Sequence, residues 1–187
     1  GGKVLDSSIP NLGEDTLSSL IFKNATVRGA KTAIREKDLG IWQSWSWADV
    51  AEEVGLLAGG LAAKGFIRGN NLAIIGDNRP RLYWSFAASQ SLGGIPVPLY
   101  QDAIADEMIY VFNDAEIEFA IVEDQEQVDK LLEIMPQCEK LRCIIYDDPR
   151  GMRHYDHPAV VAYEDVRELG VKFLGEQPNF VESELNK

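Results

Sequence analysis

The amino-acid sequence predicts an α/β fold: a three-layer lobe with a mainly parallel sheet flanked by helices, plus a small N-terminal β-hairpin. Three observations support this prediction. The 187 residues suffice for one large α/β domain. From residue 71 onward, short apolar runs alternate with helical patterns, which favours right-handed βαβ crossovers and parallel strands. Before them, β-like runs at residues 32–36 and 41–45 flank the turn-forming residues 38–40, which indicates a hairpin.

Two helices are predicted around the hairpin. Asp15 or Thr16 can cap the first helix, and Gly29 ends it. The sequence Ser46-Trp47-Ala48-Asp49 has the form of a capping box and starts the second helix, which ends at Gly65. The apolar residues of this second helix recur at helical spacing, at Val50, Val54, Leu57 and Leu61.

The parallel sheet is predicted from four short apolar runs. These are residues 72–75, Ile95–Leu99, Phe119–Val122 and Cys143–Tyr146. We expect the helices between them to begin at polar caps, at Asp77 or Asn78, at Asp102 and at Asp124. Pro80 falls in the first turn of the first such helix, where proline is tolerated.

The pattern weakens after residue 146. Residues 147–158 are predicted to form a polar loop, residues 163–169 a short helix, and residues 171–187 a polar tail with few core residues. The sequence therefore divides into three parts: an N-terminal extension (1–14), in which Gly1 and Gly2 resemble a tag scar, an α/β lobe (15–170) and the tail (171–187).

Composition excludes several classes of protein. Acidic residues outnumber basic ones by 30 to 18, and the net charge of −12 repels nucleic acid at long range. Two cysteines, Cys138 and Cys143, are too few for a disulfide scaffold and indicate reduced thiols. The sequence shows neither a signal-peptide pattern nor an apolar run long enough to span a bilayer. We expect a cytoplasmic protein, with membrane-peripheral binding as the further option for its full-length form.

Phosphate-binding motifs are missing from the chain. It contains neither G-x-G-x-x-G nor G-x-x-x-x-G-K-[ST]. Gly59-Gly60 lies within a predicted helix, where it favours close helix packing. Gly93-Gly94 ends another helix, where glycine suits the left-handed cap.

Histidines suggest only a weak metal motif. His154 and His157 flank an aspartate, but a zinc site needs three or four ligands. Neither cysteine belongs to a C-x₂-C pair that could supply the missing ligands. We therefore predict that His154 and His157 lie in a solvated loop rather than in a metal site. A serine nucleophile motif of the form G-x-S-x-G is also missing.

Charged residues near the predicted strand ends have two possible roles, in ligand binding or as ordinary surface residues. Arg79 and Arg81 follow a strand at the edge where parallel sheets bind ligands, so they could contact an anion or serve as ordinary surface residues. For the acid pairs Glu52-Glu53, Glu123-Asp124 and Asp147-Asp148, helix capping or solvation suffices. Trp84 could line an acyl channel or form plain core.

Several segments together resemble a known enzyme family. They are residues 16–35, the run from Trp45 to Gly65, residues 71–103 (with IGDNRP and GGIPVPLY), residues 107–123 and residues 163–166. Their amino-acid sequences are similar to the N-terminal part of the AMP-forming acyl-CoA synthetase superfamily, and most of all to its long-chain fatty-acid–CoA ligases. The likeness extends over about residues 15–170.

The resemblance implies a fatty-acid substrate that is activated with ATP and Mg²⁺ to an acyl-adenylate and then transferred to CoA. It also implies that the catalytic, cofactor-binding and metal-binding residues lie downstream of Lys187, so none is assigned here. The tail 171–187 is similar to the segment before the family's phosphate loop. We therefore expect an N-terminal fragment that is inactive alone, binds no cofactor itself and is able to dimerise through a surface exposed by truncation.

Two alternatives remain. The first is a fragment of an adenylating ligase for an aromatic or short acid. The second is a stand-alone flavodoxin-like binding or regulatory module, which predicts a well-formed ligand crevice at the strand ends.

Overall fold

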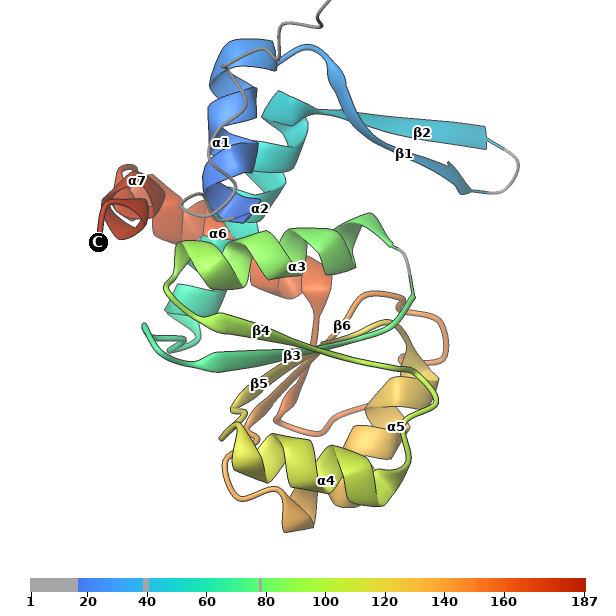
Figure 1. The fold of residues 1–187 in the computed structure, drawn as a ribbon. Coiled ribbons are helices and arrows are strands. Elements are labelled where there is room, and N and C mark those ends of the chain that lie inside the picture. Colours follow the sequence, from blue (N-terminus) through green and yellow to red (C-terminus); the bar gives the residue numbers. More distant parts are fainter. Residues whose placement is uncertain (1–16, 39–40, 78) are drawn as a thin grey trace, which may run out of the picture.

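The computed structural model describes residues 17–38, 41–77 and 79–187 (Figure 1). The predicted caps Asp15, Thr16 and Asn78, the extension 1–14 and turn residues 39 and 40 lie outside this range. The described chain forms a parallel sheet with helices on both faces and a separate antiparallel hairpin. The predicted fold class is therefore confirmed.

The helices and strands follow one another along the chain. The helices are α1 (Leu17–Arg28), α2 (Trp47–Ala63), α3 (Pro80–Ser91), α4 (Ala105–Asp114), α5 (Gln125–Ile134), α6 (Tyr163–Glu176) and α7 (Phe180–Leu185), with a 3₁₀ turn at Met135–Gln137. The hairpin consists of β1 (Thr32–Asp38) and β2 (Ile41–Ser46). The sheet consists of β3 (Asn71–Ile75), β4 (Ile95–Leu99), β5 (Phe119–Val122), β6 (Cys143–Tyr146) and β7 (Val160–Ala162), in the order β4-β3-β5-β6-β7.

Local hydrogen bonds explain where the helices begin. Ser46 and Asp49 form the predicted capping box, with bonds of 3.0 and 3.1 Å. Asp124 caps α5 as predicted. The prediction that Asp102 caps α4 is wrong: a turn closed by the Ala103 amide intervenes, and Ile104 takes the cap position. At the start of α3 the cap position belongs to Arg79, so Asp77 is not its cap.

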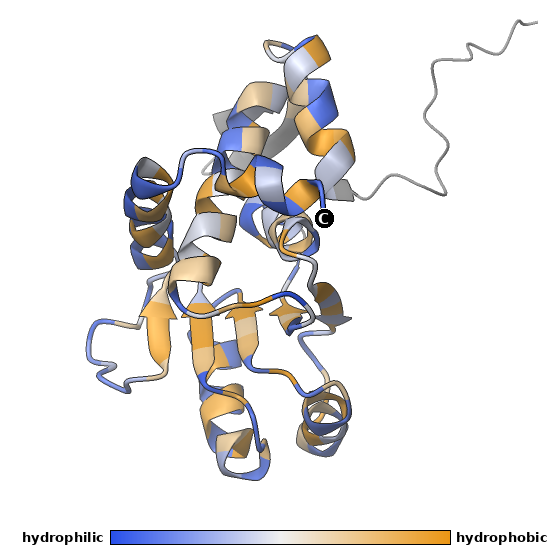
Figure 2. Cartoon of the chain, turned by 90° about the vertical axis from the view of Figure 1, so that its left-hand side faces the viewer, coloured by the Kyte–Doolittle hydropathy of each residue, from blue (hydrophilic) through white to orange (hydrophobic). Residues whose placement is uncertain are grey.

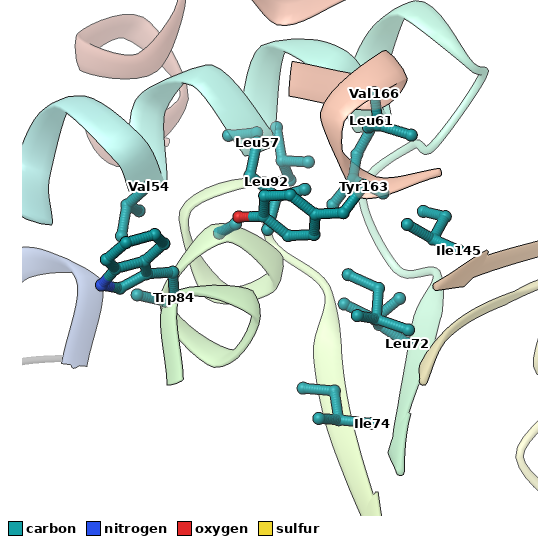
Figure 3. Close-up of a cluster of buried hydrophobic side chains, with 14 of the residues drawn as sticks. Val54, Leu57, Leu61, Leu72, Ile74, Trp84, Leu92, Ile145, Tyr163 and Val166 are labelled. Atoms are coloured by element: carbon teal, nitrogen blue, oxygen red, sulfur yellow. The ribbon is translucent and has the colours of Figure 1, made fainter. Parts of the chain in front are cut away.

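The sheet separates two apolar clusters. Inward-facing residues of one face pack against α1, α2, α3 and α6, and those of the other face pack against α4 and α5. Figure 2 shows the apolar strands between helices that carry both apolar and polar residues. Figure 3 shows the first cluster, where Leu57, Leu61 and Tyr163 meet Leu72 and Ile145 of the sheet. This is the three-layer arrangement that the alternating sequence pattern predicts.

Glycine allows α2 and α6 to touch at backbone distance. A Cβ atom on Gly60 would lie 2.0 Å from the carbonyl oxygen of Val166, and one on Gly170 would lie 1.8 Å from that of Leu56. The prediction that Gly59-Gly60 permits close helix packing is confirmed. Gly93 has a positive φ of 71° at the end of α3, as predicted for a left-handed cap.

The C-terminal region is more ordered than the sequence pattern indicates. The helix predicted to end at residue 169 continues to Glu176, and α7 follows within the predicted polar tail. Phe180 and Val181 pack against the first apolar cluster. The short strand β7 was not predicted. Its three residues are too few to show a period, and its pairing with β6 is a tertiary contact. In the described part of the chain, no helix has the length and apolar character needed to cross a bilayer.

Candidate functional site

Polar residues that follow the parallel strands gather at one edge of the sheet. In the observed strand order, the winding of the chain reverses between β3 and β5. Open α/β sheets bind ligands at such a switch point, outside the carboxyl ends of the strands. Asp77 and Arg79 follow β3, Glu123 follows β5, and Asp147 follows β6. This carboxyl edge is therefore the candidate site.

Glu123 fills the switch point. Its Oε1 accepts a hydrogen bond from Arg79 Nε at 2.6 Å, and its Oε2 accepts one from the backbone N–H of Asp77 at 3.1 Å. The backbone of Gly76 packs directly against Glu123 and Leu82. A Cβ atom on Gly76 would lie 2.4 Å from Leu82 Cδ1 and 2.9 Å from Glu123 Cβ. A carboxylate of the protein itself thus occupies the cation and the amide that an anionic ligand would use.

Arg81 joins three elements at the same edge. Its guanidinium pairs with Asp147 at 3.3 Å and with Glu164 at the start of α6. It also lies over the ring of Tyr163, 4.6 Å from the ring centre. Tyr163 is buried, and burial raises the pKa of its hydroxyl far above its ordinary value. Arg81 therefore ties the beginnings of α3 and α6 to the end of β6.

The adjacent carboxylates Asp147 and Asp148 have opposite environments. Burial raises the pKa of Asp147 above its usual range, although Arg81 opposes the shift. Hydrogen bonds from Arg150 lower the pKa of Asp148, with Nη2 at 2.5 Å and the backbone amide at 3.0 Å. Asp148 also lies 3.9 Å from Arg79. The edge is thus a network in which each guanidinium faces carboxylates of the same chain.

The sequence singled out Arg79 and Arg81 of this network, but neither Arg150 nor the carboxylates that the arginines bind. Arg79 and Arg81 bind carboxylates within the protein, whereas an anionic ligand or a plain surface role was expected. Of the acid pairs, only Asp124 acts as a helix cap. Glu123 and Asp147 bind arginines instead. A usable signal existed, because both are the first residue after a buried strand.

Two open clefts adjoin the network. One of about 320 Å³ lies between α3 and the end of β4 and has a mostly apolar lining, with Leu82, Phe86 and Leu99 inside and Tyr83 and Tyr100 exposed at its rim. The other, of about 300 Å³, is lined by charged residues of the network together with Trp45 and Trp84. Trp84 is 4% exposed, and its ring packs edge-on against that of Trp45, with 5.8 Å between the ring centres. Of the two predicted roles, acyl channel or core residue, the structure supports the core residue.

The histidine loop shows no metal-like grouping. Within residues 17–38, 41–77 and 79–187, no three His, Cys, Asp or Glu side chains gather as a metal site would require. The Nδ1 atom of His157 accepts a hydrogen bond from the amide of Ala159 at 3.1 Å. The loop is solvated at the histidines as predicted, with His154, Asp156 and His157 exposed. Met152 is buried in it, and the Tyr155 hydroxyl bonds to Asp129 of α5.

Comparison with known proteins decides the family. The family model described as AMP-binding enzyme matches residues 21–179, which is most of the chain. The chain belongs to the AMP-binding enzyme family.

Curated relatives of this AMP-binding family member are much longer. The chain is 25% identical over 166 residues to the long-chain-fatty-acid–CoA ligase ACSBG2 of Xenopus laevis, covering 88% of this chain and 22% of that protein. It is 30% identical over 119 residues to the 4-hydroxybutyrate–CoA ligase 2 of Metallosphaera sedula, covering 64% of this chain and 21% of the relative. The chain thus spans about a fifth of the length of these relatives.

A solved ligase shares the fold. The anthranilate CoA ligase AuaEII, solved in complex with anthranoyl-AMP, superposes with a TM-score of 0.70 over 81% of this chain and 27% of its own, at 19% identity. This likeness concerns the fold alone.

The carboxyl edge of this AMP-binding family member does not fit the phosphates of ATP. The cation and amide at the switch point already hold Glu123, and further carboxylates surround them. The family match over residues 21–179 disfavours the stand-alone flavodoxin-like binding module. That the family's catalytic, cofactor-binding and metal-binding residues lie beyond Lys187 stays a prediction.

Proposed function

We propose that the chain is the N-terminal lobe of an AMP-forming fatty-acid–CoA ligase. In this proposal the whole enzyme activates a fatty acid with ATP and Mg²⁺ to an acyl-adenylate and then transfers the acyl group to CoA. The family match over residues 21–179 is the observation that carries the proposal. The fatty-acid assignment draws on the ligase of Xenopus laevis, whose similarity extends over most of the chain.

In this proposal the lobe acts as a scaffold rather than as the chemical centre. Its charged edge is satisfied internally, and its buried residues join the helices to the sheet. Catalysis of phosphoryl and adenylyl chemistry depends on positioned cations and amides at the phosphates. Since Arg79 and Arg81 already bind carboxylates, other parts of the enzyme must supply those groups.

Activity measurements on residues 1–187 test the scaffold role. We expect negligible acid-dependent ATP–pyrophosphate exchange from the purified chain, with fatty, aromatic and short hydroxy acids alike. A longer family member that is active under the same conditions serves as the positive control. Clear exchange by the 1–187 protein, abolished by heat, would refute the proposal that the chemistry lies elsewhere.

A ligase for an aromatic or short acid is the second candidate. One similarity favours it: the 4-hydroxybutyrate–CoA ligase 2 of Metallosphaera sedula is 30% identical over 119 residues. The coding sequence beyond Lys187 separates a ligase of either kind from a binding module. A Ser/Thr/Gly-rich loop within a few tens of residues decides for the ligase, and an acid panel with the encoded full-length protein then ranks the substrates.

In this proposal the enzyme lies in the cytoplasm, and membrane-peripheral binding is the alternative that cell fractionation would reveal.

Self-association of the 1–187 lobe is expected through exposed side chains such as Ile95, Tyr83 and Tyr100 rather than by strand addition. The Ile95 amide points inward to Asn70, so Pro96 and Pro98 take the outward positions of edge strand β4 and offer no N–H donor there. Sedimentation over a range of concentrations tests this.

A further inference from the structure

Glu123 is buried at a place where a charge is costly. Only 8% of the residue is exposed, and an ionised carboxylate loses much of its hydration on burial. Its partner Arg79 keeps 36% of its side chain exposed, so the pair lies at the boundary between core and solvent. Ion pairs that are open to solvent contribute little stability, so the stability of the fold gives only a weak reason for a carboxylate at this position.

The two donors that hold Glu123 make up an oxyanion-binding arrangement. The Asp77 amide donates to one carboxylate oxygen at 3.1 Å, and the Arg79 guanidinium donates to the other at 2.6 Å. Charge-assisted pairs of this kind bind carboxylate and phosphate oxygens strongly. They stand at the switch point between β3 and β5, beside the close approach at Gly76. The carboxylate already bound there shows that the arrangement holds an oxyanion.

We propose that Glu123 makes an autoinhibitory contact: its carboxylate is the internal occupant of an oxyanion site formed by the Asp77 amide and Arg79. An external phosphate-like oxyanion binds there only when the Glu123 side chain leaves. The inference rests on the proposed function only for its consequence, which is that the contact keeps phosphates of a ligase's nucleotide from binding unproductively to this lobe.

Removal of Glu123 takes away the carboxylate that lies nearest to Arg79. Asp148 lies 3.9 Å from Arg79 Nη2, but its oxygens already accept bonds from Arg150 at 2.5 to 3.1 Å. Asp147 is held by Arg81. Removal of Glu123 therefore leaves Arg79 without its nearest counter-charge, so the site is more favourable to an incoming anion than it is in the parent protein.

Binding of inorganic phosphate to the 1–187 protein and its variants tests the contact. We expect Glu123→Ala to bind phosphate at least about tenfold more tightly than the parent protein. Binding is measured by calorimetry and by the phosphate-dependent shift in unfolding temperature. Glu123→Gln, which keeps the shape and one acceptor, should give a smaller gain. Arg79→Leu added to Glu123→Ala should abolish the gain.

Glu118→Ala is the matched control. Glu118 pairs with Arg142 at 3.0 Å just before β5, at the opposite end of that strand from Glu123. Its removal therefore also takes a carboxylate away from an arginine, but not at the switch point. Equal phosphate affinity in Glu123→Ala and the parent, or an equal gain in Glu118→Ala, overturns the proposal.

If the Glu123 variants do not fold, the Asp77 amide resonance of the parent protein is followed while phosphate is raised to high concentration. A saturable shift supports displacement of Glu123, and an unchanged resonance overturns it. None of these readouts depends on ligase activity, so failure here is distinct from failure of the proposed function.

Discussion

The two faces of the parallel sheet are covered in different ways. On one face, α2 and α6 approach so closely that Gly60 and Gly170 leave no room for a Cβ atom. On the other face, α4 and α5 pack through larger side chains, among them Met108, Phe112 and Leu131. A contact between backbones cannot adjust to added volume, whereas a contact between flexible side chains can repack. The first face therefore fixes helix positions, and the second tolerates substitution.

The largest effect is expected at Gly170. In Gly170→Ala, the added methyl group would meet the Leu56 carbonyl at 1.8 Å and force α6 away from α2. We expect a loss of about 3 kcal/mol or more in the free energy of unfolding, the upper end for overpacked sites. Urea-induced unfolding followed by circular dichroism measures it.

Gly175 in the same helix provides the control. An added Cβ there has no neighbour within 4 Å. Gly175→Ala should therefore be neutral or stabilise the protein by about 0.5–1 kcal/mol, since alanine suits a helix better than glycine does. Equal behaviour of the two variants would show that the helices do not touch at Gly170.

A smaller effect is expected on the opposite face. Met108 is buried in the cluster between the sheet, α4 and α5. Met108→Leu conserves volume, so we expect it to cost less than about 1.5 kcal/mol. The same urea experiment measures it, and a loss as large as that of Gly170→Ala would contradict the contrast between the faces.

The smallest effect concerns pH at the carboxyl edge. Asp148 has a lowered pKa, so its contribution to stability is present above the pKa of the unfolded chain, about 3.9, and is lost as pH falls through the folded value. Asp147 has a raised pKa, so its contribution is present below the unfolded value and is lost as pH rises through the folded one.

Asparagine substitutions separate the two carboxylates. The destabilisation caused by Asp148→Asn should shrink as the pH is lowered through the acid range. Asp147→Asn should become more favourable relative to the parent as the pH rises. Urea unfolding between acid and neutral pH measures both differences, and parallel pH profiles would show that the two environments are alike.

Much of the fold could be predicted because its signals are local. The capping box at Ser46 and the cap at Asp124 depend on residues three apart, and the four longer parallel strands are contiguous apolar runs. Asp102 was assigned wrongly because an intervening turn leaves no local signal. The helix α7 was missed because its few apolar residues are stabilised by distant parts of the core.

For the candidate site, the sequence determined which charged residues follow the strands and which family the chain resembles. Only the tertiary structure decided that Glu123 reaches across to Arg79 and Asp77, that Arg81 pairs with Asp147 and Glu164, and that Gly170 opposes Leu56. The physical reason is that these partners lie 44 or more residues apart along the chain. Local periodicity and propensity carry no information about such pairs, which are set by the order and register of the strands.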